Sequence, residues 1–149
     1  MQPETEACTV PTADQRVTRS SAYDDSYEAA LAFDDQVNSQ WISAPTGGPA
    51  WIATRGPDAP RAVTGYALHF ANGTLTSRAP RDWRFLGWDG ERWLVLDQRT
   101  AETMWLGKER RTYALAKPGV YAAYCLRITD DNDERAGVVV ISLGSLELQ

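Results

Sequence analysis

Short alternations of hydrophobic and polar residues fill most of the chain, and no segment sustains the periodicity of a long helix. Glycine, proline, asparagine and aspartate interrupt the alternation about every ten residues, as expected for strands joined by turns. Roughly eight such segments at this spacing are typical of an all-β sandwich. The predicted strands cover residues 16–20, 50–55, 62–70, 82–88, 92–98, 110–115, 121–129 and 138–148.

The chain has the length of one domain. Its 149 residues contain no linker, internal repeat or second compositional block, so we predict a single domain over residues 1–149. Residues 1–14 precede the first predicted strand and are expected to be a loosely attached N-terminal segment. One short helical segment is predicted at residues 24–33, with Asp24 or Asp25 as its N-cap.

The segment 79–97 places three tryptophans around an Asp-Gly pair at 89–90. Asp-Gly between strand-like runs predicts a hairpin, because both residues tolerate the positive φ of a tight turn. Alternation along the two strands predicts that Trp83 and Trp93 are core residues, each burying roughly 150–250 Å². Trp88 lies beside the turn, where we expect it to be half exposed.

The charge balance limits the classes of partner. The formal net charge is −5, which argues against nucleic acid and against an anionic membrane surface, because both are bound mainly through Lys and Arg. No apolar run reaches the roughly 18 residues of a membrane-spanning helix, so no membrane insertion is expected. The N-terminus lacks the pattern of a signal peptide, which leaves a cytosolic protein or a chain whose leader has been removed.

The two cysteines, Cys8 and Cys125, lie far apart in the sequence. A disulfide between them would tie the N-terminal segment to an apolar strand and indicate an oxidising compartment. Two unpaired thiols, with Cys125 buried as a small hydrophobic residue, explain the sequence equally well. Because the chain has no CxxC motif and no Cys/His cluster, a zinc site is not expected.

An acidic and polar loop at residues 34–39 lies between Phe33 and Trp41. Calcium takes six to eight oxygen ligands from carboxylates, carbonyls and hydroxyls, and this composition can supply several of them. A solvated turn is the alternative, since most acidic loops bind no metal.

Four motifs in order along the chain carry a resemblance to a known family. AFDDQVNSQWIS resembles the A-(F/I)-D-G-(D/N)-x-x-T-x-W loop of the discoidin, or coagulation factor 5/8 type C, family of galactose-binding-like domains. APRDWRFLGWDGERWLVLD, YAAYCLRIT and SLGSLEL resemble the hairpin, a later strand and the closing strand of the same family. The resemblance implies an eight-stranded antiparallel jelly-roll β-sandwich, in agreement with the strand pattern, and places Trp41 and Trp51 in the core.

The resemblance also implies a structural calcium ion. Its ligands would be the backbone carbonyls of Leu31 and Gln36, the carboxylates of Asp34 and Glu147, and Ser39. Asp35 stands where the family has glycine, and Ser39 where it has threonine, a change that keeps the hydroxyl. The ion would fasten the loop to the last strand and take no part in chemistry.

For function, the resemblance implies binding, and bacterial members of the family are often carbohydrate-binding modules. The histidine that commonly follows the first-motif tryptophan in galactose-binding members is replaced by Ile42, and the chain's one histidine, His69, lies in a strand. Sugar recognition needs an aromatic face to stack on the ring and a few planar polar groups to bind its hydroxyls. The candidate ligand-binding residues are Asn72, Arg78, Arg81 and Trp105. Trp105 is the candidate exposed platform, and packing across a sandwich edge is its alternative.

The sequence therefore predicts a non-catalytic binding module for a cell-surface or matrix glycan, working outside the cell or on its surface. The alternative is a protein-interaction or structural module of a larger assembly, such as an adhesin, a phage tail or a multidomain enzyme. Partners would be a glycan or glycoconjugate, a protein or an adjoining enzyme domain. An enzyme is not expected, because no P-loop, GxGxxG or GxSxG motif occurs and one histidine excludes His-pair chemistry.

Overall fold

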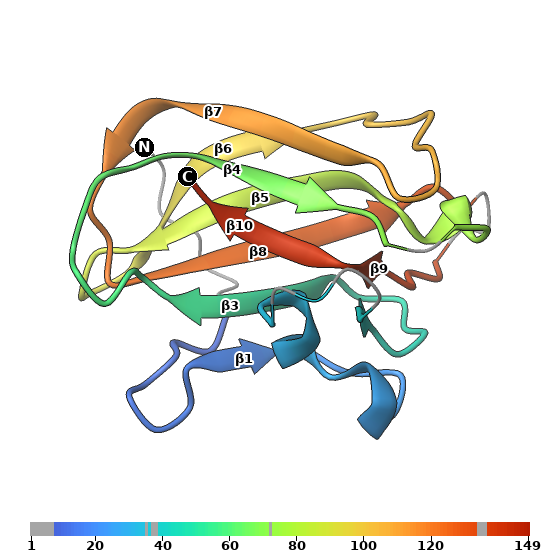
Figure 1. Cartoon of the computed structure of the whole chain (residues 1–149), viewed down its shortest axis with the longest axis horizontal. Helices are drawn as coiled ribbons and strands as arrows, with labels where there is room; N and C mark the ends of the chain where they lie inside the picture. Colours follow the sequence, from blue (N-terminus) through green and yellow to red (C-terminus); the bar gives the residue numbers. More distant parts are fainter. Residues whose placement is uncertain (1–7, 35, 37–38, 72, 134–136) are drawn as a thin grey trace.

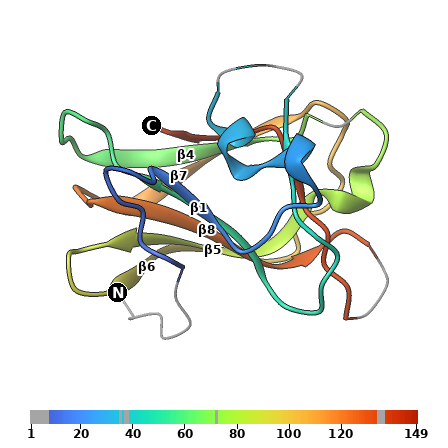
Figure 2. The same cartoon turned by 90° about the horizontal axis from the view of Figure 1, so that it is seen from below.

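Two antiparallel sheets form the two layers of the fold (Figure 1, Figure 2). A computed structural model of the chain describes residues 8–34, 36, 39–71, 73–133 and 137–149. The five-stranded sheet contains, in spatial order, β1 (Val17–Arg19), β3 (Ala50–Arg55), β8 (Ala123–Asp131), β5 (Pro80–Trp88) and β6 (Trp93–Arg99). The three-stranded sheet contains β10 (Ser145–Leu148), β4 (Val63–His69) and β7 (Arg110–Gly119). A separate ladder pairs β2 (Trp41–Ile42) with β9 (Ser142–Leu143).

This architecture confirms the predicted β-sandwich, with eight strands in the two main sheets. Each predicted strand is present within a few residues of its expected bounds. The sequence pattern missed β2, which is only two residues long, and it joined β9 and β10 into one segment. Among the described residues, no helix is long and apolar enough to cross a membrane.

The predicted helical segment is two short 3₁₀ helices, η1 (Asp25–Tyr27) and η2 (Ala29–Ala32). Asp24 caps η1, because its Oδ1 accepts a hydrogen bond from the backbone N–H of Ser26 at 2.8 Å. Glu28 has extended backbone angles, φ −64° and ψ 156°, and so separates the two helices. A third 3₁₀ helix, η3 (Thr76–Arg78), precedes β5.

The core between the sheets contains a polar link. Tyr66 on β4 donates a hydrogen bond to Asp97 Oδ2 on β6 at 2.6 Å, and its hydroxyl accepts one from Trp83 Nε1 at 2.8 Å. The Tyr66 ring stacks on Phe85 at 4.2 Å between centroids. Burial and the bond to Asp97 raise the pKa of the Tyr66 hydroxyl, which therefore remains a donor. The link joins the two sheets without leaving the buried indole N–H of Trp83 unpaired.

A second apolar cluster covers the opposite face of the five-stranded sheet. On β8, Cys125 belongs to this cluster, whereas its neighbours Tyr124 and Leu126 face the other sheet. A disulfide joins Cys8 to Cys125, which settles the alternative that the sequence left open. Trp93 is 1% exposed within this cluster, and its Nε1 donates to the carbonyl of Cys8 at 2.9 Å.

We predicted that residues 1–14 are loosely attached. Residues 1–7 lie outside the described residues, and from Cys8 onward the segment is attached through the disulfide. Burial of Trp83, Trp93 and Trp41 is confirmed. Trp51 is only half-buried, because it lies at the edge of the outer cluster and not between the sheets. Trp88 is half-buried, as the hairpin pattern predicts for a residue beside the turn.

The link through Tyr66 can be tested with two tyrosines that both lie between the sheets. We expect Tyr66→Phe to lower the free energy of unfolding by about 1–3 kcal/mol, because Trp83 loses its buried acceptor. Tyr113→Phe is the control: the buried Tyr113 hydroxyl has no hydrogen-bond partner among the described residues, so its removal should not destabilise the protein. Urea unfolding measures both variants, and equal effects would contradict the assignment.

A second prediction concerns the disulfide, which joins residues 117 positions apart. We expect Cys8→Ala to lower the free energy of unfolding by about 2–5 kcal/mol, because the long loop in the unfolded chain is no longer closed. A reducing agent should destabilise the wild type to a similar degree and leave the variant unchanged. A wild type that is insensitive to complete reduction would show that the outer cluster holds the N-terminal segment without the covalent bond.

Candidate functional site

Four loops meet at one end of the sandwich, on the right of Figure 1. They join β2 to β3, β4 to β5, β6 to β7 and β8 to β9. We call this the loop end. It carries the predicted ligand-binding residues, so its internal contacts decide which side chains are available to a ligand.

Trp105, in the loop between β6 and β7, is part of the framework of the loop end. Its side chain is 5% exposed, so the expectation of an exposed platform is wrong and the alternative of packing at the sandwich edge is confirmed. The indole Nε1 donates to the carbonyls of Pro80 at 2.9 Å and Glu102 at 3.1 Å. Phe70 packs at 6.3 Å between ring centroids. The indole is therefore used inside the protein and not at its surface.

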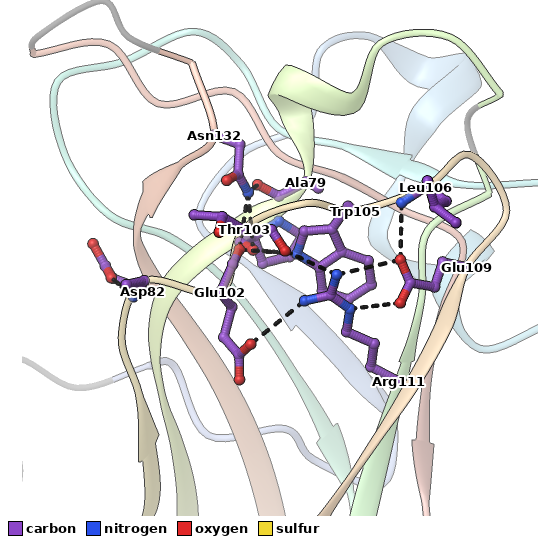
Figure 3. Close-up of polar contacts among 11 residues, drawn as sticks. Ala79, Asp82, Glu102, Thr103, Trp105, Leu106, Glu109, Arg111 and Asn132 are labelled. Carbon is purple, nitrogen blue, oxygen red and sulfur yellow. Dashed lines mark hydrogen bonds and ion pairs between the residues drawn. The ribbon is translucent and has the colours of Figure 1, made fainter.

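Arg111 on β7 covers the Trp105 ring, with its guanidinium carbon 4.1 Å from the ring centroid (Figure 3). Its Nε donates to Glu109 Oε2 at 2.8 Å, and its terminal nitrogens donate to the Thr103 carbonyl at 2.9 Å and to Glu102 Oε2 at 3.4 Å. The hydrogen bond from Arg111 holds the pKa of the Glu109 carboxyl below its usual value. All of these bonds hold the loop, so Arg111 is not a free cation.

Asn132 ties three segments of the loop end together (Figure 3). Its Nδ2 donates to the carbonyls of Ala79 at 2.9 Å, Pro80 at 3.3 Å and Glu102 at 3.2 Å. This role of Asn132 cannot be predicted from the sequence, since a single asparagine in an acidic loop carries no signal of it. The three acceptors belong to two segments, residues 79–80 and residue 102, and both are distant from Asn132 in the sequence.

The β6–β7 loop has an unusual backbone for its composition. Ala101, Met104 and Lys108 have positive φ of 54°, 61° and 65°, a region that favours glycine. Each such residue costs on the order of 1 kcal/mol and persists only where its surroundings fix it. The Trp105–Arg111 contacts provide that fixation, so the loop is held in one conformation.

Three apolar side chains are exposed at the loop end. Met104 is 85% exposed, Leu106 70% and Leu75 44%. The loops that carry them touch, because a Cβ added at Gly107 would lie 2.6 Å from the carbonyl oxygen of Gly73. Sequence reasoning did not select these residues, since scattered aliphatic residues in loops have no distinctive spacing.

The predicted arginines differ in their environments. Arg78, the last residue of η3, is half-buried, and within the described part of the chain no hydrogen bond or ion pair engages its guanidinium. Arg81 NH1 lies 3.4 Å from Asp130 Oδ2, in an ion pair with both side chains about two-fifths exposed. Asn72 lies outside the described residues. Arg78 thus has no partner among the described residues, whereas Arg81 is partly exposed and is engaged, within the same part of the chain, through one terminal nitrogen only.

The residues predicted to hold calcium are brought together in part. Asp34 accepts from the Gln36 backbone N–H at 3.0 Å and from the Ser39 hydroxyl at 2.6 Å, so three predicted ligands share one loop. Glu147 instead accepts from Arg110 Nε at 2.6 Å. Leu31 lies in η2, and Asp35 is outside the described residues. Carboxylate and hydroxyl oxygens are the kind of ligand that a hard cation prefers, whereas Glu147 would have to leave Arg110 to join them.

No protein-family model matches the chain, and no curated protein is similar to it in sequence. Solved structures do share its fold. Chitosan-binding module 1 of a Paenibacillus sp. IK-5 chitosanase/glucanase superposes with a TM-score of 0.70 at 18% identity, covering 89% of this chain and 92% of that one. The family 32 carbohydrate-binding module of Clostridium perfringens NanJ, solved with galactose, gives a TM-score of 0.70 at 12% identity, covering 89% and 90%.

An F5/8 type C domain from Bacteroides fragilis has the same TM-score of 0.70, with 19% identity and coverage of 89% and 88%. At these identities the likeness establishes the fold. It confirms at that level the resemblance that the four sequence motifs indicate.

Proposed function

We propose that this chain is a non-catalytic carbohydrate-binding module whose ligand contacts lie at the loop end. The observation that carries the proposal is a loop end cross-linked by Trp105, Arg111 and Asn132. Beside its exposed apolar side chains, the Arg78 guanidinium has no hydrogen-bond or ion-pair partner among the described residues. A sugar needs an apolar surface for its ring face and planar polar groups for its hydroxyls, and both are available here. The sugar-binding modules that share the fold support the same assignment.

The apolar surface lies close to the arginine. The Arg78 backbone N–H donates to the Leu75 carbonyl at 3.0 Å, which places both residues in one 3₁₀ turn. The contact of Gly107 with Gly73 brings Leu106 to the same rim. Because the framework is ordered before binding, little conformational entropy is lost when a ligand docks. We propose Arg78 and Arg81 as hydrogen-bond donors to sugar oxygens, and Leu75 and Leu106 as the apolar surface.

The disulfide between Cys8 and Cys125 supports a location in an oxidising compartment, outside the cell or on its surface. The exposed Met104 and Leu106 favour one alternative, a module that docks on a protein partner. The two functions predict different results in the same experiment.

A glycan array followed by titration of the best ligand tests the proposal. We expect Arg78→Ala to weaken binding about tenfold, the loss of one charged hydrogen bond. Arg92→Ala is the matched control, since Arg92 is an exposed arginine in the hairpin turn at the other end of the sandwich and should not affect binding. A glycan bound equally by both variants would contradict the role of Arg78. The alternative would be favoured if no glycan bound and a protein partner bound instead through the exposed Met104 and Leu106.

We also propose that the loop at residues 34–39 binds one structural calcium ion through Asp34, Gln36 and Ser39, with Leu31 and Glu147 completing the site. The proposal predicts that millimolar calcium raises the melting temperature and that Asp34→Asn abolishes the rise. Asp25→Asn, which removes an equal charge from the nearby η1, should retain it. Arg110→Gln should strengthen the response, because Glu147 is released from its ion pair. No rise in the wild type would exclude the site.

A further inference from the structure

A pocket of about 370 Å³ lies at the end of the sandwich opposite the loop end, on the left of Figure 1. Residues 55–61, which follow β3, form one wall, and residues 120–122, which precede β8, form the other. This volume lies within the range of small-ligand sites, roughly 300–1,000 Å³. None of the predicted ligand-binding residues is in this pocket.

The aromatic residue of the pocket is fixed in place by its neighbours. A Cβ added at Gly87 would lie 2.8 Å from Cγ of Tyr121, and one added at Gly119 would lie 2.8 Å from its Cε2. The Tyr124 ring meets the Tyr121 ring edge-on at 5.9 Å, and the Tyr124 hydroxyl accepts from the Tyr121 backbone N–H at 3.2 Å. Two glycines therefore make room for a half-buried ring whose position is set before any ligand arrives.

The two walls are joined directly. The Gly56 backbone N–H donates to the Ala122 carbonyl at 2.8 Å. A Cβ added at Gly56 would lie 2.6 Å from the carbonyl oxygen of Tyr121, so only glycine permits this approach. Pro57 and Pro60 restrict the backbone of the longer wall. The pocket is therefore a rigid feature of the fold.

The charges of the pocket favour an anion. Asp58 supplies the one carboxylate among the lining residues, and Arg16 neutralises it at 2.6 Å. In the described part of the chain, the Arg61 guanidinium donates to the backbone carbonyls of Ala62 and Leu148, at 3.4 and 3.3 Å, and to no carboxylate. Within the described residues, no hydrogen bond or ion pair engages the guanidinium of Arg55. Two guanidinium groups thus lack a carboxylate partner, although the whole chain carries a net charge of −5.

We propose that this pocket binds a sugar unit that carries a carboxylate, a hexuronic acid. The guanidinium groups of Arg55 and Arg61 match the planar geometry of a carboxylate and donate charge-assisted hydrogen bonds. The ring of Tyr121 provides the surface against which the pyranose packs. That the ligand is a sugar rests on the proposed function, whereas the preference for an anion rests on the pocket alone.

Calorimetric titration of the full chain with trigalacturonate tests the proposal. The methyl ester of the same trisaccharide keeps the rings and removes the charge, so it should bind at least tenfold more weakly. Arg55→Gln and Arg61→Gln should each weaken trigalacturonate binding about tenfold, with unchanged melting temperatures. Binding should also weaken as salt rises, because exposed charge pairs are screened.

Arg78→Ala separates this site from the loop end. This variant should leave trigalacturonate binding unchanged even if it abolishes binding of the array ligand. The proposal for the pocket and the proposal for the loop end are therefore tested separately. The proposal would be overturned if the acid and its methyl ester bound equally well. It would also be overturned if Arg55→Gln and Arg61→Gln both bound trigalacturonate as tightly as the wild type does. Inorganic phosphate competing as well as galacturonate would overturn the sugar assignment and leave a simple anion site.

Discussion

The five-stranded sheet has to bury both of its faces, and the rest of the fold follows from this constraint. Its central strand β8 is buried along six consecutive residues, with Tyr124 and Leu126 on one face and Cys125 on the other. Five of these six residues are apolar and the sixth is Arg127, and a strand buried in this way is stable only when each face is covered. The three-stranded sheet covers the inner face, and the N-terminal segment covers the outer face through the disulfide and the hydrogen bond from Trp93 to Cys8.

The sequence pattern predicted the strands well because alternation is a local property. It predicted that Trp83 and Trp93 are buried, but it gave no means of seeing that they are buried on opposite faces of one sheet. The cover of Trp93 comes from Cys8, 85 positions away, and nothing local records that contact. For the same reason, the sequence could not decide between a disulfide and two unpaired cysteines.

The candidate site was harder to predict than the fold. Trp105, in polar sequence surroundings, has the local pattern of an exposed residue, yet Arg111 and Phe70 cover it. The sequence does not reveal whether an arginine will be held by carboxylates, as Arg111 is by two glutamates, or will have no partner among the described residues, as is true of Arg78. Pairing depends on which loops meet, and that is settled by sheet topology. The motif resemblance singled out the loop at residues 34–39, but it could not foresee that Arg110 pairs with Glu147.

The two ends of the sandwich are stabilised by different contacts. The loop end depends on the bonds around Trp105, whereas the opposite pocket borders the outer cluster. The Ala122 backbone N–H donates to the Trp88 carbonyl at 3.1 Å, and the Trp88 ring packs on Trp93 at 5.4 Å between centroids. The covalent attachment of the N-terminal segment thus supports the pocket wall through two tryptophans. Both ends also share the core between the sheets, because Trp105 belongs to it and Tyr121 packs against it. This close-packed core is therefore the route by which a packing change at one end reaches the other.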